Sequence, residues 1–261
     1  MNPPELPGEA APEIPPRSPA YVATPQPARP LLTYGLMAFT TLVYLAQMAS
    51  TALLGGDYPA ALGAKVNALI AAGQWWRLIT PVLLHGSLLH IGFNMYALYV
   101  LGPELERHFG RGRFLPLYLL GGFAGNVTSM VFSTAPSLGA STAIFGLLGA
   151  QGVFIYQNRG LFGQRSRHAL QSILTIAAIN FFIGLSPGID NWGHLGGLVG
   201  GAAFSWFAGP LLYLDGIYPY YTLRDRRPPA NAWLAAGAVG TLFVALAAGV
   251  IFWRGALTHA P

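Results

Sequence analysis

Four side chains in three separated segments of the sequence are suited to one reaction: Ser141, His194, His90 and Asn94. A serine hydroxyl becomes a strong nucleophile when a neighbouring base removes its proton, and imidazole can do so near neutral pH. His90 and Asn94 are four residues apart, so on a helix they share one face and can donate to a single developing negative charge. These residue types predict acyl transfer by serine attack, with a histidine as general base.

The serine and the histidine each have a simpler interpretation when considered alone. Serine is a favoured N-cap residue, and Ser141 stands where an apolar helix is expected to begin. A single histidine in an apolar segment, such as His194, is often a packing or hydrogen-bonding residue. The first turn of a helix, however, also offers free backbone N–H groups and a positive end, which suit an oxyanion. The two residues alone leave both interpretations open.

Glycines provide the expected means of bringing the serine and the histidine together. Gly193, Gly197 and Gly201 recur every four residues, which gives one helix a flat face that another backbone can approach closely. Gly146 and Gly149 offer small surfaces on the segment that follows the serine. If these faces meet, the serine and the histidine lie near the same end of the bundle, at a similar depth.

The composition places these helices in a membrane. Hydrophobic residues make up 53% of the chain and charged residues 9%, against about 25% charged residues in an ordinary soluble domain. Stretches of the ~20 apolar residues that cross a bilayer recur from residue 31 onward. We therefore expect an all-α polytopic membrane protein, a six-helix core plus one C-terminal transmembrane helix, with spans at about 31–54, 85–103, 114–134, 140–158, 168–187, 192–214 and 231–253.

The chain divides by composition into three parts. Residues 1–30 contain ten prolines and no apolar run, which predicts a disordered cytoplasmic tail. The six-span core is expected over residues 31–214. A loop and the seventh span are expected over residues 215–261.

The arginines indicate the orientation in the membrane. They are concentrated in the connections after the second, fourth and sixth spans, so the positive-inside rule puts the N-terminus in the cytoplasm and the C-terminus outside. The glutamates of the N-terminal segment do not suit an organellar presequence, which favours the inner (plasma) membrane of a cell.

Because the arginines are scattered among short loops, no nucleic-acid partner is expected. The chain has no cysteine, which excludes disulfides and thiolate metal sites.

Two further groups of polar residues lie outside the predicted spans. Trp76 and Arg77 belong to the long outer segment 55–84, and an indole beside a guanidinium suits the headgroup level of a bilayer. Glu106 follows the second span and is expected to play a structural role by pairing with Arg107 or Arg111.

Taken together, these motifs resemble the rhomboid family of intramembrane serine proteases over nearly all of residues 31–253. The resemblance rests on separated motifs in a fixed order: Trp76-Arg77, His85-Gly86-Ser87-Leu88-Leu89-His90 with Asn94, the pattern Gly102, Glu106 and Gly110, Gly139-Ala140-Ser141, and Gly193-His194-Leu195-Gly196-Gly197. One position departs from the family pattern, because Thr142 follows the serine where the family often has glycine. A β-branched residue there stiffens the turn and adds bulk.

The resemblance implies a mechanism and a set of partners. The dyad would be Ser141 and His194, and the oxyanion hole would be formed by His90, Asn94 and Ala140 together with the Ser141 N–H. It further implies a water-filled cavity open to the outside, no cofactor and no metal. The expected partners are transmembrane protein substrates and the lipid bilayer.

Other mechanisms require residues that the sequence lacks or places unfavourably. Asp190, one turn before His194, could complete a triad, but it is expected in a short hydrated loop, so a dyad is favoured. A zinc site made by His85, His90 and His194 is disfavoured, because five residues of helix rotate His85 away from His90. An aspartyl protease needs paired aspartates within the spans, and a retinal pump needs a late lysine. The sole lysine is Lys65.

The main alternative is a catalytically weak or inactive rhomboid-like protein that binds transmembrane helices for quality control. The presence of both Ser141 and His194 opposes this alternative, whereas Thr142 slightly favours it. A small transporter or channel is the third possibility, and the lack of charged groups along any span disfavours it.

Overall fold

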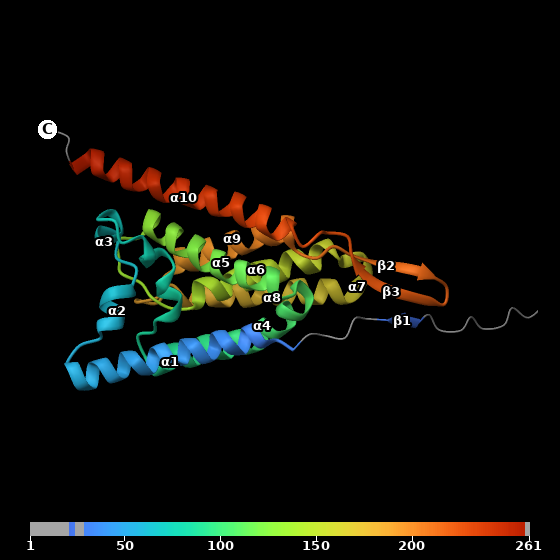
Figure 1. Cartoon of the computed structure of the whole chain (residues 1–261), viewed down its shortest axis with the longest axis horizontal. Coiled ribbons are helices and arrows are strands. Elements are labelled where there is room, and N and C mark those ends of the chain that lie inside the picture. Colours follow the sequence, from blue (N-terminus) through green and yellow to red (C-terminus); the bar gives the residue numbers. More distant parts are fainter. Residues whose placement is uncertain (1–20, 24–28, 259–261) are drawn as a thin grey trace, which may run out of the picture.

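Seven long helices form the body of the protein in this computed structural model, which describes residues 21–23 and 29–258 (Figure 1). They are α1 (Leu31–Leu54), α4 (Leu88–Phe109), α5 (Arg111–Phe132), α6 (Ser141–Gln157), α8 (Gln164–Ile183), α9 (Asn191–Ala208) and α10 (Asn231–Thr258). Short helices fold the segment between α1 and α4: α2 (Tyr58–Gly63), α3 (Asn67–Ala71), η1 (Trp75–Leu78) and η2 (Thr80–Leu83). Another, α7 (Arg159–Phe162), precedes α8.

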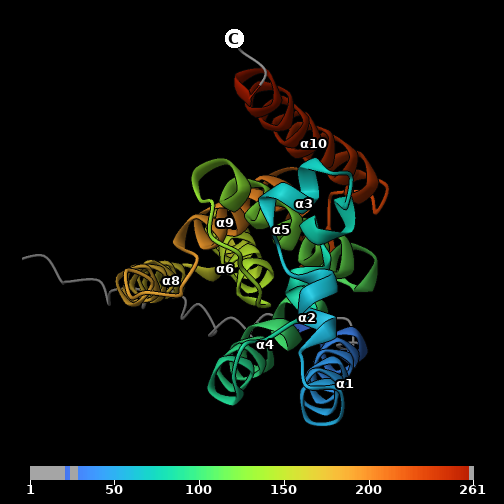
Figure 2. The same cartoon turned by 90° about the vertical axis from the view of Figure 1, so that its left-hand side faces the viewer.

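Helix α6 is the centre of the bundle. Viewed from the end of the bundle, it lies among α4, α5, α8 and α9, with α1 and α10 further out (Figure 2). Every residue from Thr142 to Ala150 is buried, which fits a helix that is apolar on all sides. The helix that begins with the candidate nucleophile is therefore enclosed by protein along most of its length.

The predicted contact between glycine faces of α6 and α9 is present. A methyl group added at Gly201 would lie 2.0 Å from the Gly146 carbonyl oxygen, and one at Gly149 would lie 2.2 Å from the Leu198 carbonyl oxygen. At Gly197 it would lie 2.0 Å from the Thr142 carbonyl oxygen. The two backbones thus touch over about two turns of α6, as the glycine spacing indicated.

Several helix boundaries differ from the expected spans, and two of the differences have a clear local cause. The second span was expected from residue 85, but α4 begins at Leu88, because the Ser87 hydroxyl accepts a hydrogen bond from the His90 N–H as an N-cap. The sixth span was expected to reach residue 214, but α9 ends at Ala208, before Gly209-Pro210. Proline has no N–H to continue a helix.

The fold is not purely α, because two strands after α9 and one before α1 form a three-stranded sheet. Strands β2 (Leu212–Ile217) and β3 (Tyr220–Asp225) form an antiparallel hairpin, and β1 (Tyr21–Ala23) pairs with β3 in parallel. The hairpin extends beyond the helices in Figure 1. An Arg113 Nη1 contact to Asp225 Oδ2 at 2.5 Å joins it to the first turn of α5. The rest of the proline-rich tail expected over residues 1–30 lies outside the described residues, apart from Arg29 and Pro30.

Length and composition alone mark three helices of the described chain as able to cross a membrane: Leu31–Leu54, Arg111–Phe132 and Asn231–Trp253. The shorter α6, with 17 residues, and the glycine-rich α9 are covered by other helices, so their own surfaces need not be apolar enough for lipid. The protein is a mostly helical membrane protein, and the count of seven spans remains a prediction.

The close contact of α6 and α9 predicts a sharp difference between two glycine substitutions. Gly201→Ala should lower the melting temperature markedly, because its methyl group overlaps the Gly146 backbone and the helices must separate. Gly237→Ala, on an exposed part of α10 with no atom within 4 Å of the added methyl group, should be neutral or slightly stabilising. Thermal unfolding in detergent measures both, and equal melting temperatures would contradict the packing described.

Candidate active site

The side chains of Ser141 and His194 meet at the start of α6 and α9. The Ser141 Oγ lies 2.9 Å from His194 Nε2, a hydrogen-bond distance between residues 53 positions apart. Ser141 is the first residue of α6 and Ala140 is its N-cap, so the serine does not act as the cap residue. Its hydroxyl instead faces a base, as the predicted chemistry requires.

Phe145 holds the imidazole of His194 in position. The two rings are stacked with centroids 4.3 Å apart and planes 7° apart, and His194 is buried. Phe145 lies one turn after Ser141, so one face of α6 carries both the serine and the ring that stacks on His194. Phe145 was not among the site residues predicted from the sequence. Its four-residue spacing from Ser141 could have indicated that it lies on the same helix face.

Asp190 does not complete a triad in this arrangement. Its Oδ1 accepts a hydrogen bond from the Gly193 N–H at 2.9 Å, as the N-cap of α9, and its Oδ2 accepts from the Ser129 hydroxyl. Nδ1 of His194 is buried and has no hydrogen-bond partner among the described residues. Both carboxylate oxygens are therefore engaged away from the imidazole, which favours a dyad.

The segment before Ser141 is held by His85, which belongs to the histidine motif of the resemblance and to the disfavoured zinc site but was assigned no role in the predicted dyad mechanism. His85 Nε2 accepts a hydrogen bond from the Ala140 N–H at 3.4 Å. The rings of His85 and His90 are 5.0 Å apart, because His85 precedes the helix and the expected rotation between them does not apply. The Ala140 N–H expected in the oxyanion hole is thus already engaged. The N–H of Ser141 lies in the first helical turn, where no intrahelical partner exists.

His90 and Asn94 lie on one face of α4, as their spacing indicated. The Asn94 side chain is buried and donates to the His90 carbonyl oxygen at 2.9 Å, within the same helix. The His90 ring is so close to Gly139 that a methyl group added there would lie 2.7 Å from His90 Nε2. The ring therefore reaches the segment that leads into Ser141, and the Asn94 amide must exchange its present partner to reach an oxyanion.

Thr142 occupies space that two glycines provide. It is buried, and methyl groups added at Gly125 and Gly193 would lie 2.6 Å from its Cβ and 3.0 Å from its Cγ2 respectively. The bulk expected from the β-branched residue is thus accommodated between α5 and α9. The Ser141–His194 contact forms with this residue in place.

Arg77 differs from the headgroup anchor expected from the sequence. Its guanidinium is buried and donates to the carbonyl oxygens of Ala64 and Ala61 at 2.8 and 2.7 Å, and its Nε donates to Gln74. Three hydrogen bonds from one guanidinium to acceptors of the same segment, residues 55–84, stabilise the folded form of that segment. Trp76 is half exposed, and its Nε1 donates to the Leu62 carbonyl oxygen at 3.0 Å.

Glu106 has the structural role that was expected, with an additional partner. Its carboxylate accepts hydrogen bonds from the N–H groups of Leu32 and Thr33 and from the Thr33 hydroxyl, at 2.7–2.9 Å. The Nε of Arg111 lies 3.8 Å away. A buried carboxylate at the positive end of α1 fastens that helix to α4.

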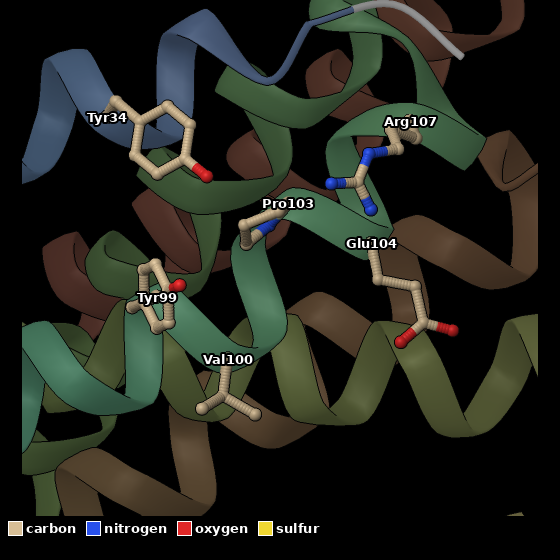
Figure 3. Close-up of a pocket in the computed structure, with 6 residues that line it drawn as sticks. All are labelled: Tyr34, Tyr99, Val100, Pro103, Glu104 and Arg107. Carbon is tan, nitrogen blue, oxygen red and sulfur yellow. The ribbon is translucent and has the colours of Figure 1, made fainter. Parts of the chain in front are cut away.

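A cavity of about 380 Å³ lies apart from these residues, between α1 and α4 (Figure 3). Its lining residues are Tyr34, Tyr99, Val100, Pro103, Glu104 and Arg107. The last turns of α4 that form it are about 20 Å along the helix from His90, at 1.5 Å per residue. The cavity is not part of the Ser141 site.

The described residues contain no group of three histidine, cysteine, aspartate or glutamate side chains placed to hold a metal ion. The groups that do meet at the site are a serine hydroxyl, three imidazoles and backbone N–H groups. Their arrangement suits nucleophilic attack on a carbonyl carbon.

The fold and the site define a multi-pass membrane protein whose helical bundle brings a serine and a histidine into hydrogen-bond contact. Residues 72–211 match the Rhomboid domain, a range that includes both of these residues. The chain is 38% identical over 237 residues to Rhomboid protease GluP of Bacillus subtilis, which covers 90% of this chain. The chain belongs to the rhomboid family.

Other relatives align with shorter parts of the chain. RHOMBOID-like protein 9, chloroplastic, of Arabidopsis thaliana is 34% identical over 157 residues, which are 60% of this chain and 36% of that protein. Putative rhomboid protease YdcA of Bacillus subtilis is 38% identical over 143 residues, or 53% of this chain and 70% of that protein. The chain matches only 42% of the length of GluP.

The hydrogen bonds of Asp190 predict how a neutral replacement behaves. Asp190→Asn keeps an oxygen that can cap α9 and removes only the charge, so most activity should remain. Cleavage rates of a membrane substrate measure this effect against Ser141→Ala. A loss as deep as that of Ser141→Ala would show that the carboxylate acts on the histidine as the third member of a triad.

Proposed function

We propose that this protein is an intramembrane serine endopeptidase that cleaves transmembrane segments of other membrane proteins. The observation that carries the proposal is the 2.9 Å contact between Ser141 Oγ and His194 Nε2. Membership of the rhomboid family and similarity to proteins named rhomboid proteases support the same activity.

In the proposed reaction, His194 Nε2 takes the proton of Ser141 as its Oγ attacks the carbonyl carbon of the scissile amide. The tetrahedral oxyanion is stabilised by the Ser141 N–H and by donors from His90 and Asn94. The histidine then returns the proton to the leaving amine as the C–N bond breaks, which leaves an acyl ester on the serine. A water molecule, deprotonated by the same histidine, hydrolyses the ester and restores the hydroxyl.

The proposed substrate is a transmembrane helix that unwinds locally. Intact helical hydrogen bonds shield the backbone carbonyls, so small or helix-breaking residues near the cleavage site are expected to favour cleavage. Helix α8 packs mainly on α6, where Ile173 lies near Gly152, and is largely exposed along its length. We place the N-terminus in the cytoplasm and the C-terminus outside, in the plasma or inner membrane.

An inactive protein that binds transmembrane helices is the second candidate. The feature that favours it is Thr142 beside the nucleophile. Its hydroxyl is buried without a hydrogen-bond partner among the described residues, which gives the turn a polar group that glycine would not. The intact serine–histidine contact favours the protease.

The test is cleavage of a single-span substrate by the purified protein in liposomes. The wild type should release two fragments, and Ser141→Ala and His194→Ala should each lower the rate by about a thousandfold or more. Ser172→Ala is a matched control, because the Ser172 hydroxyl on α8 bonds only within its own helix. It should cleave like the wild type.

The outcomes separate the two candidates. Continued cleavage by Ser141→Ala would overturn the assignment of the nucleophile. A wild type that retains the substrate helix without cutting it would establish the helix-binding alternative. Thr142→Gly then tests whether the extra side chain suppresses catalysis.

A further inference from the structure

Lys65 is the sole lysine of the chain, and it is fully buried. Its Nζ donates a hydrogen bond to the Ser129 hydroxyl on α5 at 2.8 Å. An ammonium group removed from water is costly unless charged or polar partners compensate for the lost hydration. A fully buried lysine at the edge of a helical bundle therefore needs a structural reason, and neither the proposed mechanism nor the membrane topology supplies one.

The hydrogen bonds of Lys65 continue to the helix that carries the candidate base. The Ser129 hydroxyl accepts from Lys65 and donates to Asp190 Oδ2. The other carboxylate oxygen accepts from the Gly193 N–H, the residue before His194. An ammonium, a hydroxyl and a carboxylate thus form a directed chain, and the carboxylate caps α9.

The backbone of Lys65 holds the segment that carries the candidate nucleophile. Its N–H donates to the Ser137 carbonyl oxygen at 2.9 Å, and its carbonyl oxygen accepts from the Ser137 N–H at 3.1 Å. Two residues further on, the Gly139 N–H donates to the Pro81 carbonyl oxygen at 2.9 Å, and Ser141 follows. Lys65 is therefore hydrogen-bonded to the segment that precedes Ser141 and, through Ser129 and Asp190, to the segment that precedes His194.

We propose that Lys65 is a positioning residue that sets the Ser141–His194 geometry from the outer segment. The inference rests on the proposed protease function for its catalytic meaning. The hydrogen-bond relay from Lys65 through Ser129 to Asp190 is itself independent of that function. The ammonium neutralises the Asp190 carboxylate across the Ser129 hydroxyl and so keeps the capped end of α9 beside the start of α6. Without this cation the partly buried carboxylate loses the charge that neutralises it, so it draws water or moves outward and takes the first turn of α9 with it.

The test uses Lys65→Met in the full-length protein, a change that keeps the length of the side chain and the backbone bridge to Ser137. Two properties are measured: the rate at which a fluorophosphonate probe modifies Ser141, and hydrogen exchange in a peptide covering residues 190–196. Because misplacing reacting groups by about 1 Å costs up to about a hundredfold in rate, we expect labelling to slow by roughly tenfold or more. Exchange in the first turn of α9 should rise.

Asn67→Leu is the matched control. Asn67 lies two residues from Lys65 and also joins the outer segment to α5, by donating to the Met130 and Ser133 carbonyl oxygens. These two hydrogen bonds do not reach α9, so the loss of Asn67 should lower the melting temperature without slowing labelling. Ser129→Ala removes a single oxygen from the relay and gives the same test if Lys65→Met does not fold.

The second-site variant distinguishes positioning from general destabilisation. Lys65→Met with Asp190→Asn removes both charges and keeps the cap of α9, so labelling should recover much of the loss caused by Lys65→Met alone. A merely structural lysine gives additive losses instead. Three outcomes would each overturn the proposal. In the first, Lys65→Met folds and reacts with the probe at the wild-type rate. In the others, the losses in the double variant are additive, or Asn67→Leu slows labelling as much as Lys65→Met.

The same experiment separates this proposal from the proposed function. A wild type that neither cleaves nor reacts with the probe contradicts the protease. Hydrogen exchange then decides the relay alone: increased exchange at residues 190–196 in Lys65→Met supports it, and unchanged exchange overturns it.

Discussion

The backbones of α6 and α9 approach so closely that a methyl group at Gly201 would lie 2.0 Å from the Gly146 carbonyl oxygen. Within a membrane, helices gain little from the hydrophobic effect when they associate, so such contacts depend on small residues that let backbones touch. Both helices begin at the same end of the bundle. The contact between Ser141 and His194 follows from that register, because each side chain stands within the first turns of its own helix.

Buried polar groups of the segment between α1 and α4 fix this end of the bundle. Arg77 is satisfied entirely within the segment, whereas Lys65 reaches outward to α5 and, through Ser129, to the cap of α9. His85 adds a further contact at this end, because its Nε2 accepts a hydrogen bond from the Ala140 N–H just before Ser141. Each of these groups would be costly to bury alone, and together they bind the segment to the site.

The residue pattern allowed the helical membrane fold, the convergence of Ser141 and His194 and the glycine contact to be predicted, because each depends on local spacing. His85 and Phe145 were missed for different reasons. The Ser87 cap moved the start of α4 and brought His85 to the site, whereas Phe145 resembles any other apolar residue of a buried helix. The burial of Arg77 depends on carbonyl groups that only the folded segment gathers, and no single-sequence pattern reveals such acceptors.

The strands after α9 were missed because residues 210–214 continue the apolar character of the preceding helix, and the residues from 215 onward were expected to form a loop. Gly209-Pro210 was the available signal that the helix ends there. The sheet adds three short strands to a mostly helical fold without altering the site, since its hairpin lies near the first turn of α5, where Arg113 meets Asp225. The position of the dyad depends on the opposite end of that helix, where Ser129 joins the relay.

The most direct test of the central claim is to map the residue that a fluorophosphonate modifies in the membrane-embedded protein. A hydroxyl activated by a neighbouring imidazole reacts far faster than an ordinary serine. The account predicts a single adduct, found by mass spectrometry on the peptide containing Ser141 and lost in His194→Ala. An adduct on another serine, or labelling that persists without His194, would contradict it.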